Sequence, residues 1–237
     1  MIDLKKDVKY VKGVGPNRVQ LLNKLGIFTL EDLITYYPRT YEDRSKPKSL
    51  LECIDGEEAL IEVIAISKMI ESKFSRKTMQ KIMIRDNTSS AEAIWFNQTY
   101  LKSKFTVGKK YRMYGKIEKK YGKIIIASPV FDEYGSTQNT GRIIPIYPLT
   151  YQLSQNTLRK IIENAMNEVY GNLPETLPQY IIKTNRILGI NDAIKTIHFP
   201  RELEDFKKAR KRLVFEELLI TQLSLMSLKN RDVLEEK

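Results

Sequence analysis

The sequence predicts an α+β protein built from three consecutive segments. These are a helical segment over residues 1–49, an all-β domain over residues 50–135, and a linker with helices over residues 136–237. Apolar residues recur at helical spacing in the first and last segments, whereas Ile- and Val-rich runs alternate with polar residues in the middle one. With 237 residues, of which 42% are hydrophobic, the chain is long enough to bury a core in about one to three small domains.

The N-terminal segment is predicted to contain short helices joined by tight turns. A helical pattern follows Gly13-Val14-Gly15-Pro16, and Thr29 with Asp32 forms a variant of the capping box at a second helix. This order is similar to a helix-hairpin-helix DNA-binding unit, in which glycines allow the turn and free N–H groups hold a phosphate. Gly13 and Gly15 are the candidate turn residues. A helix-packing corner without DNA contacts explains the pattern equally well.

The middle segment is predicted to form a small five-stranded barrel of the OB type. The strands are expected at residues 59–70, 80–86, 91–95, 110–118 and 123–127. A short helix is expected within residues 97–104, with Leu101 and Phe105 facing inward. Five strands with a helical insert after the third are typical of the OB fold. That fold often binds nucleic acid, but it does not by itself establish the function.

The C-terminal segment is predicted to begin as a linker and to continue as helices. Residues 134–142 are rich in Gly, Ser, Thr, Gln and Asn, which indicates a connection. A helix is expected to start at Ser154 or Asn156 and to stop at Gly171. A shorter helix is expected after Pro178, followed by another one.

The last predicted helix is long and spans Leu203–Asn230. Its expected inward positions are Phe206, Ala209, Leu213, Leu218, Leu219 and Leu223. Its basic run, Lys207–Arg212, is expected to be a solvated face. The single histidine, His198, is expected to pack or to cap a helix, and not to act in catalysis.

Positive charge is concentrated in the middle of the chain. The chain has a net charge of +11, and residues 68–123 alone hold 15 Lys/Arg against 4 Asp/Glu. A surplus that is confined to one domain and interleaved with aromatic residues favours a nucleic-acid partner, because phosphate contacts release counterions. An acidic protein partner and a membrane surface remain alternatives at this point.

Three aromatic residues gather in the stretch Ile94–Tyr100. Aromatic residues beside strands usually belong to the core, but on a basic sheet they can stack on nucleic-acid bases. The candidates for base stacking are Trp95, Phe96 and Tyr100. The candidates for phosphate contacts come from the neighbouring strands and from the hairpin turn Lys119-Lys120-Tyr121-Gly122; they are Lys81, Arg85, Arg112, Lys116, Lys119 and Lys120.

Composition excludes several other kinds of protein. No run of eighteen apolar residues occurs, so we expect no membrane-spanning helix, and the first residues lack a signal peptide. The single cysteine, Cys53, excludes an internal disulfide and fits a cytoplasmic location. One cysteine and one histidine provide no ligand set for structural zinc, and we expect no metal in this chain.

Seven short motifs are spread along the whole chain. They are Val11–Pro16, Tyr37–Arg44, Phe96–Leu101, Pro145–Thr150, Leu158–Lys160, Ile197–Pro200 and Phe215–Leu219. Each motif is weak alone, but their order and spacing are specific. Together they resemble the N-terminal part of the RecG family of bacterial ATP-dependent DNA helicases, which remodel branched DNA.

The resemblance implies that the OB domain is a wedge placed at the fork of branched DNA, such as a replication fork or a Holliday junction. It also implies that Phe96 stacks on the bases of one separating arm and Tyr100 on those of the other. Trp95 departs from the family, in which many relatives carry a second phenylalanine there. The implied biological roles are recombination, repair and the reversal of stalled forks.

The family's motor is not recognisable in this sequence. A Gly-x-x-x-x-Gly-Lys-Ser/Thr phosphate loop is absent, and the Gly-Lys pairs at residues 108–109, 115–116 and 122–123 lack the following Ser or Thr. We therefore expect an isolated wedge segment that is inactive alone and holds no cofactor, whether it is a piece of a longer protein or a truncated gene product. ATP and Mg²⁺ are implied for the motor domains of the parent helicase.

Two other classes of function stay open from the sequence. One is a stand-alone OB-type protein that binds single strands without a preference for junctions. The other is a protein-interaction module, in which the OB domain docks an acidic tail such as that of single-stranded-DNA-binding protein. In all three interpretations we expect a monomer.

Overall fold

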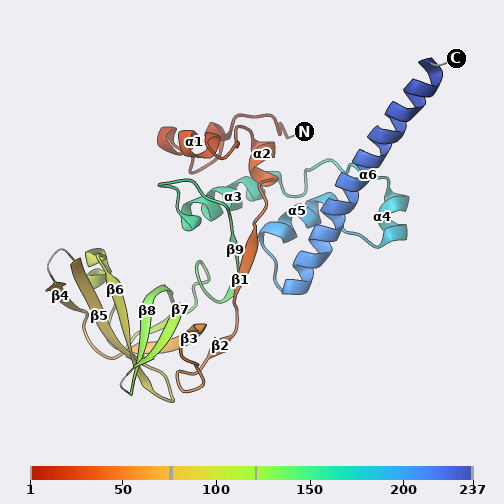
Figure 1. Cartoon of the computed structure of the whole chain (residues 1–237). Helices are drawn as coiled ribbons and strands as arrows, with labels where there is room; N and C mark the ends of the chain where they lie inside the picture. Colours follow the sequence, from red (N-terminus) through yellow and green to blue (C-terminus); the bar gives the residue numbers. More distant parts are fainter. Residues whose placement is uncertain (1, 75–76, 121, 236–237) are drawn as a thin grey trace. The chain divides into compact units, whose positions relative to one another are not determined.

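The computed structural model describes residues 2–74, 77–120 and 122–235, which divide into two compact units (Figure 1). Unit 1 combines Met1–Tyr41 with Pro145–Lys237, and unit 2 is Glu42–Ile144. The three segments expected along the sequence thus form two units in space. The chain leaves and re-enters unit 1 through strands β1 (Thr40–Arg44) and β9 (Arg142–Ile146), which form a two-stranded sheet.

Unit 1 is helical, as the sequence predicts for both of its parts. Ser154 caps the first helix of the second part, and the expected capping box at Thr29 and Asp32 is confirmed. The 3-10 helix and the α-helices of unit 1 are η1 (Val8–Tyr10), α1 (Pro16–Asn23), α2 (Leu30–Ile34), α3 (Gln155–Val169), α4 (Gln179–Asn185), α5 (Ile190–His198) and α6 (Leu203–Glu235).

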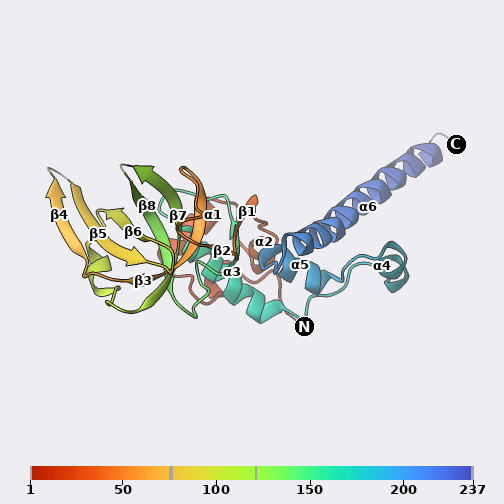
Figure 2. The same ribbon diagram turned by 90° about the horizontal axis from the view of Figure 1, so that it is seen from below.

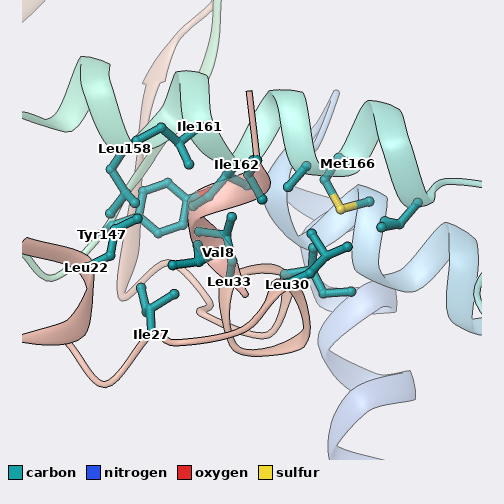
Figure 3. Close-up of a cluster of buried hydrophobic side chains, with 14 of the residues drawn as sticks. Val8, Leu22, Ile27, Leu30, Leu33, Tyr147, Leu158, Ile161, Ile162 and Met166 are labelled. Carbon is teal, nitrogen blue, oxygen red and sulfur yellow. The ribbon is translucent and has the colours of Figure 1, made fainter. Parts of the chain in front are cut away.

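One core joins the first and last parts of the chain within unit 1 (Figure 3). Apolar side chains from η1, α1, α2 and the turn before α2 pack against one face of α3. The labelled members of this core are Val8, Leu22, Ile27, Leu30, Leu33, Tyr147, Leu158, Ile161, Ile162 and Met166. Full burial of each such aliphatic side chain contributes about 1.5–3 kcal/mol. Neither part could bury its apolar face alone, which explains why they fold together.

His198 lies fully buried in unit 1, which confirms the expected packing role. Its Nε2 is 2.8 Å from the carbonyl oxygen of Ile34, and its Nδ1 is 2.8 Å from the hydroxyl of Tyr147. Because a carbonyl oxygen only accepts, Nε2 carries the proton and Nδ1 accepts from Tyr147. Burial lowers the pKa of His198 from 6.5 to about 4, against the opposing effect of the bond to Ile34.

Helix α6 is less buried than the sequence predicts. Ala209 is buried, but Leu218 and Leu223 are 64% and 56% exposed, so the inward assignment of these two residues is wrong. The C-terminal half of α6 extends past the other helices of unit 1 (Figure 1), and residues 220–229 are all exposed. The basic run is solvated except for Arg212, which is fully buried. Within the described ranges, no helix is long and apolar enough to cross a bilayer.

Unit 2 contains the β-structure. The strands are β2 (Pro47–Lys48), β3 (Glu58–Ala65), β4 (Ile70–Phe74), β5 (Lys77–Arg85), β6 (Ser90–Phe96), β7 (Lys110–Lys120) and β8 (Lys123–Glu133), and the expected short helix is the 3-10 helix η2 (Thr99–Ser103). The single strand expected over residues 59–70 is wrong. Ile66 and Ser67 bond to Met83 at the end of β3, and the chain then turns into β4, which pairs with β5 alone.

Five strands of unit 2 pair in the order of an OB barrel (Figure 1, Figure 2). The order is β3-β7-β8-β6-β5, and β3 also pairs with β5 at Ile64↔Arg85 and Ala65↔Ile84. The pair β6–β8 is parallel, and the other barrel pairs are antiparallel. With η2 placed between β6 and β7, this topology confirms the predicted fold class.

The interior of the barrel follows the period of two that the sequence shows. On β7, Tyr111, Met113, Gly115 and Ile117 are all buried, and their neighbours face outward. Gly115 is required because a Cβ there would lie 3.0 Å from the Cα of Pro129. The pairing of β7 with β8 shifts register at this point, which allows the close approach.

The stretch expected as a linker is tied to the barrel. Asp132 accepts hydrogen bonds from the backbone N–H groups of Asn139 and Thr140 and from the Thr140 hydroxyl. Thr140 is fully buried. The connection is therefore a fixed loop of unit 2, because its polar groups are satisfied by one carboxylate.

Acid should destabilise unit 1 through His198. The unfolded state binds a proton near pH 6.5 and the folded state only near pH 4, so stability falls as pH falls through this window. We expect a loss of about 2 kcal/mol between pH 7 and pH 5 in urea unfolding followed by circular dichroism. His198→Gln removes the only histidine, so its unfolding should be almost independent of pH in this range. An equal pH dependence in the variant would contradict the assignment.

Candidate nucleic-acid interface

A sharp corner follows β6 and positions the aromatic residues. Asn97 makes this corner in the left-handed backbone region, with φ of 56°. Its N–H donates to the Thr78 carbonyl at 2.7 Å, and its Oδ1 accepts from the Thr78 N–H at 3.0 Å. Asn adopts this region more readily than most residues and bonds locally through its amide. The corner is thus fastened to the N-terminal end of β5.

A second fastening comes from Gln80, which is fully buried. Its Oε1 accepts from the N–H of Gln98 at 3.0 Å, and its Nε2 donates to Glu71 on β4 at 3.2 Å. The Tyr100 hydroxyl in turn donates to the side-chain oxygen of Gln98 at 2.9 Å. The segment from β6 to η2 is therefore held by several polar contacts, of which those of the buried Gln80 restrict it most.

The corner presents Phe96 and Tyr100 to solvent, with 51% and 63% of their surfaces exposed. Exposed aromatic faces are what base stacking requires, and the stacking roles of these two residues stay predictions. Trp95 points the other way and is 1% exposed. Its Nε1 donates to the Pro129 carbonyl at 2.8 Å, and its ring lies 5.3 Å from that of Phe105. The stacking role expected for Trp95 is therefore wrong, because the period of two places it in the core.

The outer face of β5 continues the surface that carries Phe96. Met79 is the direct strand partner of Phe96, so the residues at alternate positions of β5 lie on the same face. This face includes the expected Lys81 and Arg85. It also includes Lys77, which the sequence reasoning missed although it stands in the same alternation.

Two carboxylates neutralise part of this basic surface. Glu92 pairs with Lys81 at 3.4 Å and with Lys123 at 3.7 Å, and Glu118 pairs with Lys120 at 2.6 Å. Both carboxylates are among the four acids of residues 68–123, so the net surplus is unchanged and the pairing shows which lysines are engaged.

The remaining basic candidates differ in how many hydrogen bonds or ion pairs they form within the protein. Lys119 bonds through its backbone to Asp55 at 2.7 Å and through Nζ to the Leu51 carbonyl at 3.4 Å. In the described part of the chain, Arg85 and Lys116 are exposed and form no ion pair. The adjacent Tyr121 of the expected hairpin turn lies outside the described residues.

Arg112 belongs to the scaffold and not to the free basic surface. Its Nε donates to Glu62 at 2.8 Å, and its guanidinium lies 5.0 Å over the Tyr134 ring. Gly141 makes room for it, since a Cβ at that glycine would lie 2.7 Å from Nη1. The phosphate role expected for Arg112 stays a prediction, and the ion pair with Glu62 argues against it.

Two lysines at the C-terminal end of η2 were also missed. Lys102 lies in the last turn of this short helix and Lys104 is its C-cap, and both are exposed. Their spacing of two residues carries no helical signal, so the sequence alone did not relate them to the aromatic pair.

The glycine turn expected to bind phosphate lies in unit 1. Gly13 has φ of +94°, and Gly15 precedes Pro16 at the start of α1, as expected. The Gly13 carbonyl accepts from Arg18 at 2.6 Å, and the neighbouring carbonyl of residue 12 accepts from Asn164 on α3 at 2.7 Å. These contacts account for the turn by packing, and its DNA contact stays a prediction.

A comparison with protein families identifies the part of the chain that carries the barrel and the aromatic corner. The RecG wedge domain matches residues 7–169, which include all of unit 2 with its aromatic corner. The chain belongs to the RecG wedge-domain family.

Relatives of known name agree with this family. The ATP-dependent DNA helicase RecG of Thermotoga maritima is 36% identical over 236 residues, which cover 96% of this chain and 30% of the relative. RecG of Treponema pallidum is 29% identical over 224 residues, covering 94% and 32%. The structure of RecG bound to a three-way DNA junction aligns with a TM-score of 0.88 at 35% identity, covering 98% of this chain and 32% of that one. The chain spans about a third of the length of these RecG proteins.

The ATP on which a RecG helicase depends finds no fitting site in the described part of this chain. The Gly-Lys pairs at residues 108–109, 115–116 and 122–123 lie in a turn, within β7 and at the start of β8. A phosphate loop instead leads into a helix whose N–H groups hold the phosphates. No three His, Cys, Asp or Glu side chains among the described residues are grouped to hold a metal ion.

Asn97 should be the residue on which the corner depends most. Asn97→Ala places in the left-handed region a residue that adopts it less readily than Asn, and it removes the side-chain bond to Thr78, so we expect unit 2 to lose about 1–3 kcal/mol. Asn97→Gly should lose less, because it keeps the backbone conformation. Urea unfolding measures both. Asn87→Ala, in an exposed turn, is the control and should change stability by less than about 0.5 kcal/mol. A loss in the control as large as that at Asn97 would argue against a special corner.

Proposed function

We propose that this chain binds branched DNA as the wedge region of a RecG-type helicase. The observation that carries the proposal is the pair of exposed aromatic residues, Phe96 and Tyr100, on a fastened corner beside a basic strand face. The RecG structure bound to a three-way junction, with which the whole chain aligns, supports it.

The binding step combines stacking with phosphate contacts. Where a duplex splits, the last base pair of each arm exposes its face to water, and an aromatic ring can cover it. Each stack contributes about 1–3 kcal/mol. Because the corner is already ordered, little conformational entropy is lost on binding. We assign Phe96 to one arm and Tyr100 to the other.

The basic residues hold the backbones of the separated strands. Arg85 and Lys116 are the first candidates, since they are exposed and unpaired in the described structure. Lys77, Lys102 and Lys104 join them from β5 and η2. Lys81 and Lys120 can reach phosphate only by exchanging a carboxylate for it, so each should contribute less.

The remaining steps belong to a parent helicase. We propose that motor domains in cis use ATP and Mg²⁺ to pull duplex DNA against the wedge, so that both arms are stripped and the parental strands anneal again. Such a protein acts in the cytoplasm as a monomer, in recombination, repair and the reversal of stalled forks. The chain itself performs only the binding step.

Binding of the chain to a three-way fork, a linear duplex and a single strand of equal length, at two salt concentrations, tests the proposal. A fork preference that survives the higher salt is the expected result. Equal binding to all three substrates that is lost at the higher salt would mean that electrostatic attraction alone accounts for the binding, without any preference for a junction. Displacement of fork DNA by an acidic tail of single-stranded-DNA-binding protein would instead indicate the protein-interaction role.

Phe96→Ala should weaken fork binding by about 5- to 150-fold, which corresponds to the loss of one stack, while duplex binding barely changes. Fluorescence anisotropy with labelled fork and duplex measures both affinities. Tyr180→Ala serves as the control, because Tyr180 is also an exposed aromatic residue and lies on α4 of unit 1. An equal loss on fork and duplex would refute a junction-specific role for Phe96.

Arg85→Gln and Lys116→Gln should each weaken binding to all DNA substrates alike. Each should also reduce the slope of log affinity against log salt by about 1, because one phosphate contact is lost. Arg112→Gln should leave the slope unchanged and lower the stability of unit 2, since Arg112 pairs with Glu62. A reduced slope for Arg112→Gln, with full stability, would return that residue to the phosphate-binding set.

A further inference from the structure

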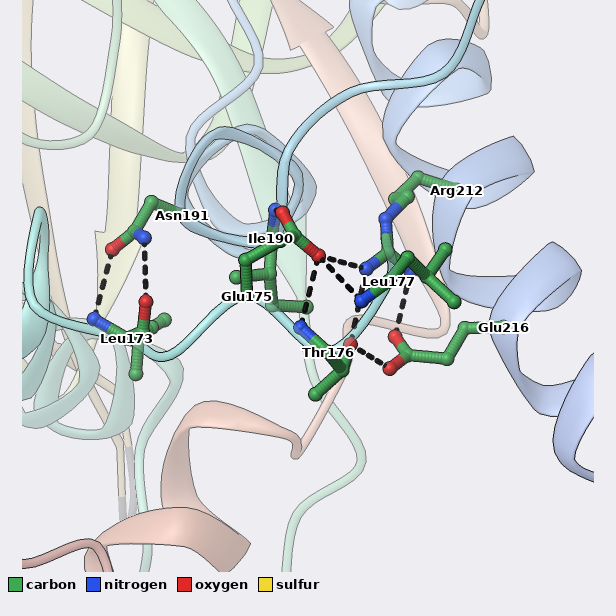
Figure 4. Close-up of polar contacts among 8 residues, drawn as sticks. All are labelled: Leu173, Glu175, Thr176, Leu177, Ile190, Asn191, Arg212 and Glu216. Carbon is green, nitrogen blue, oxygen red and sulfur yellow. Dashed lines mark hydrogen bonds and ion pairs between the residues drawn. The ribbon is translucent and has the colours of Figure 1, made fainter. Parts of the chain in front are cut away.

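A buried arginine holds the segment between α3 and α4, which we call the strap (residues 171–178), against α6 (Figure 4). Arg212 is fully buried. Its Nη2 donates to Glu175 of the strap at 2.7 Å, and its Nη1 donates to Glu216 of α6 at 2.7 Å. Thr176 joins this cluster, since its hydroxyl accepts from Arg212 and donates to Glu216. The guanidinium therefore bridges two elements that lie 37 positions apart in the sequence.

The strap is also fastened to α5. Glu175 accepts from the N–H of Ile190 at 2.8 Å, and Asn191 exchanges two hydrogen bonds with the backbone of Leu173 (Figure 4). Burial alone would raise the pKa of Glu175, but the hydrogen bonds from Ile190, Arg212 and Leu177 outweigh it and lower the pKa. The carboxylate is therefore charged at neutral pH, and the strap is held in place at both ends.

The fixed strap forms one wall of a groove in unit 1. The other walls are α2, α5 and α6, and the enclosed volume is about 490 Å³. The apolar lining includes Leu4, Ile34, Leu173, Ile190, Ile194 and Ile220. A pre-formed apolar groove of this size is typical of a binding site, because its walls need no ordering when a ligand enters.

One side of the groove carries an excess of negative charge. Glu175 and Glu216 share the single guanidinium of Arg212, which leaves one negative charge of the cluster uncompensated. Glu217 lines the same side, is exposed and has no ion-pair partner among the described residues. Burial, together with Glu216 and Glu217, raises the pKa of the nearby Tyr37 hydroxyl to about 12. Phosphate is repelled by such a site, although the chain as a whole is basic.

We propose that this groove docks an amphipathic protein segment that presents apolar side chains flanked by Lys or Arg. The apolar side chains would occupy the groove in the way a helix lies in a hydrophobic groove, and a cation would pair with Glu217 and the excess charge of the arginine cluster. The apolar lining reaches onto the exposed surface of α6 at Ile220, which is 55% exposed. The partner is a protein, because the charge that favours a cationic segment disfavours nucleic acid.

A pair of designed peptides tests this assignment. Both are amphipathic helices with the same leucine face, and the flanking residues are Lys in one and Glu in the other. Fluorescence anisotropy of the labelled peptides with the whole chain should show that the Lys peptide binds at least about tenfold more tightly. This preference opposes the net charge of +11, so non-specific attraction cannot produce it.

Two matched pairs of variants locate the site. Glu217→Lys should weaken the Lys peptide by about tenfold, while Glu163→Lys, on the exposed face of α3, should leave its affinity unchanged. Ile220→Ala should weaken binding, while Leu223→Ala, equally exposed on α6 but outside the groove, should not. All four sites are exposed, so circular dichroism should show unchanged folding.

Tighter binding of the Glu peptide, or equal affinity for both peptides, would overturn the proposal. So would an unchanged Lys-peptide affinity in both Glu217→Lys and Ile220→Ala. Fork binding should be the same in all four variants, because all four positions belong to unit 1 and the proposed stacking residues to unit 2. The proposal therefore stands or falls independently of the DNA-binding function.

Discussion

The reciprocal bonding of Asn97 and Thr78 is the constraint on which the candidate interface depends. It ends β6 at Phe96 and turns the chain into η2. Phe96 therefore stands at the end of the strand, and Tyr100 follows on the short helix after the turn. Without the left-handed residue, the strand would continue and the next side chains would alternate between core and surface. Both rings therefore come from a single turn, as the proposed binding to a DNA branch requires.

Buried polar side chains also fix how elements are arranged elsewhere in the molecule. Gln80 supports the corner, His198 joins the first and last parts of unit 1, and Arg212 holds the strap on α6. Such groups are costly to bury, and removing one partner leaves another unsatisfied. They contribute little net stability, but they allow only one arrangement of the elements they connect. The barrel face and the groove are therefore both formed before any partner binds.

The barrel face of unit 2 and the groove of unit 1 differ in local charge, and so in the kind of partner proposed for each. On the barrel, Glu92 and Glu118 pair with three lysines and so decide which cations of the basic segment are engaged. In unit 1, one guanidinium shared by two carboxylates makes a local negative site within a basic chain. Short-range pairing decides the local potential in both cases, because screening removes the effect of distant charges.

The sequence by itself determined the barrel and its inward faces, since a period of two relates each residue to its near neighbours. The same period, with Ala91 and Ala93 as buried positions, would also have placed Trp95 in the core. Only the tertiary structure decided that the first and last segments share a core, that Arg112 and Arg212 are paired inside the fold, and that a groove lies beside α6. Those features join residues far apart in the chain, and local patterns carry no record of which distant partners folding brings together.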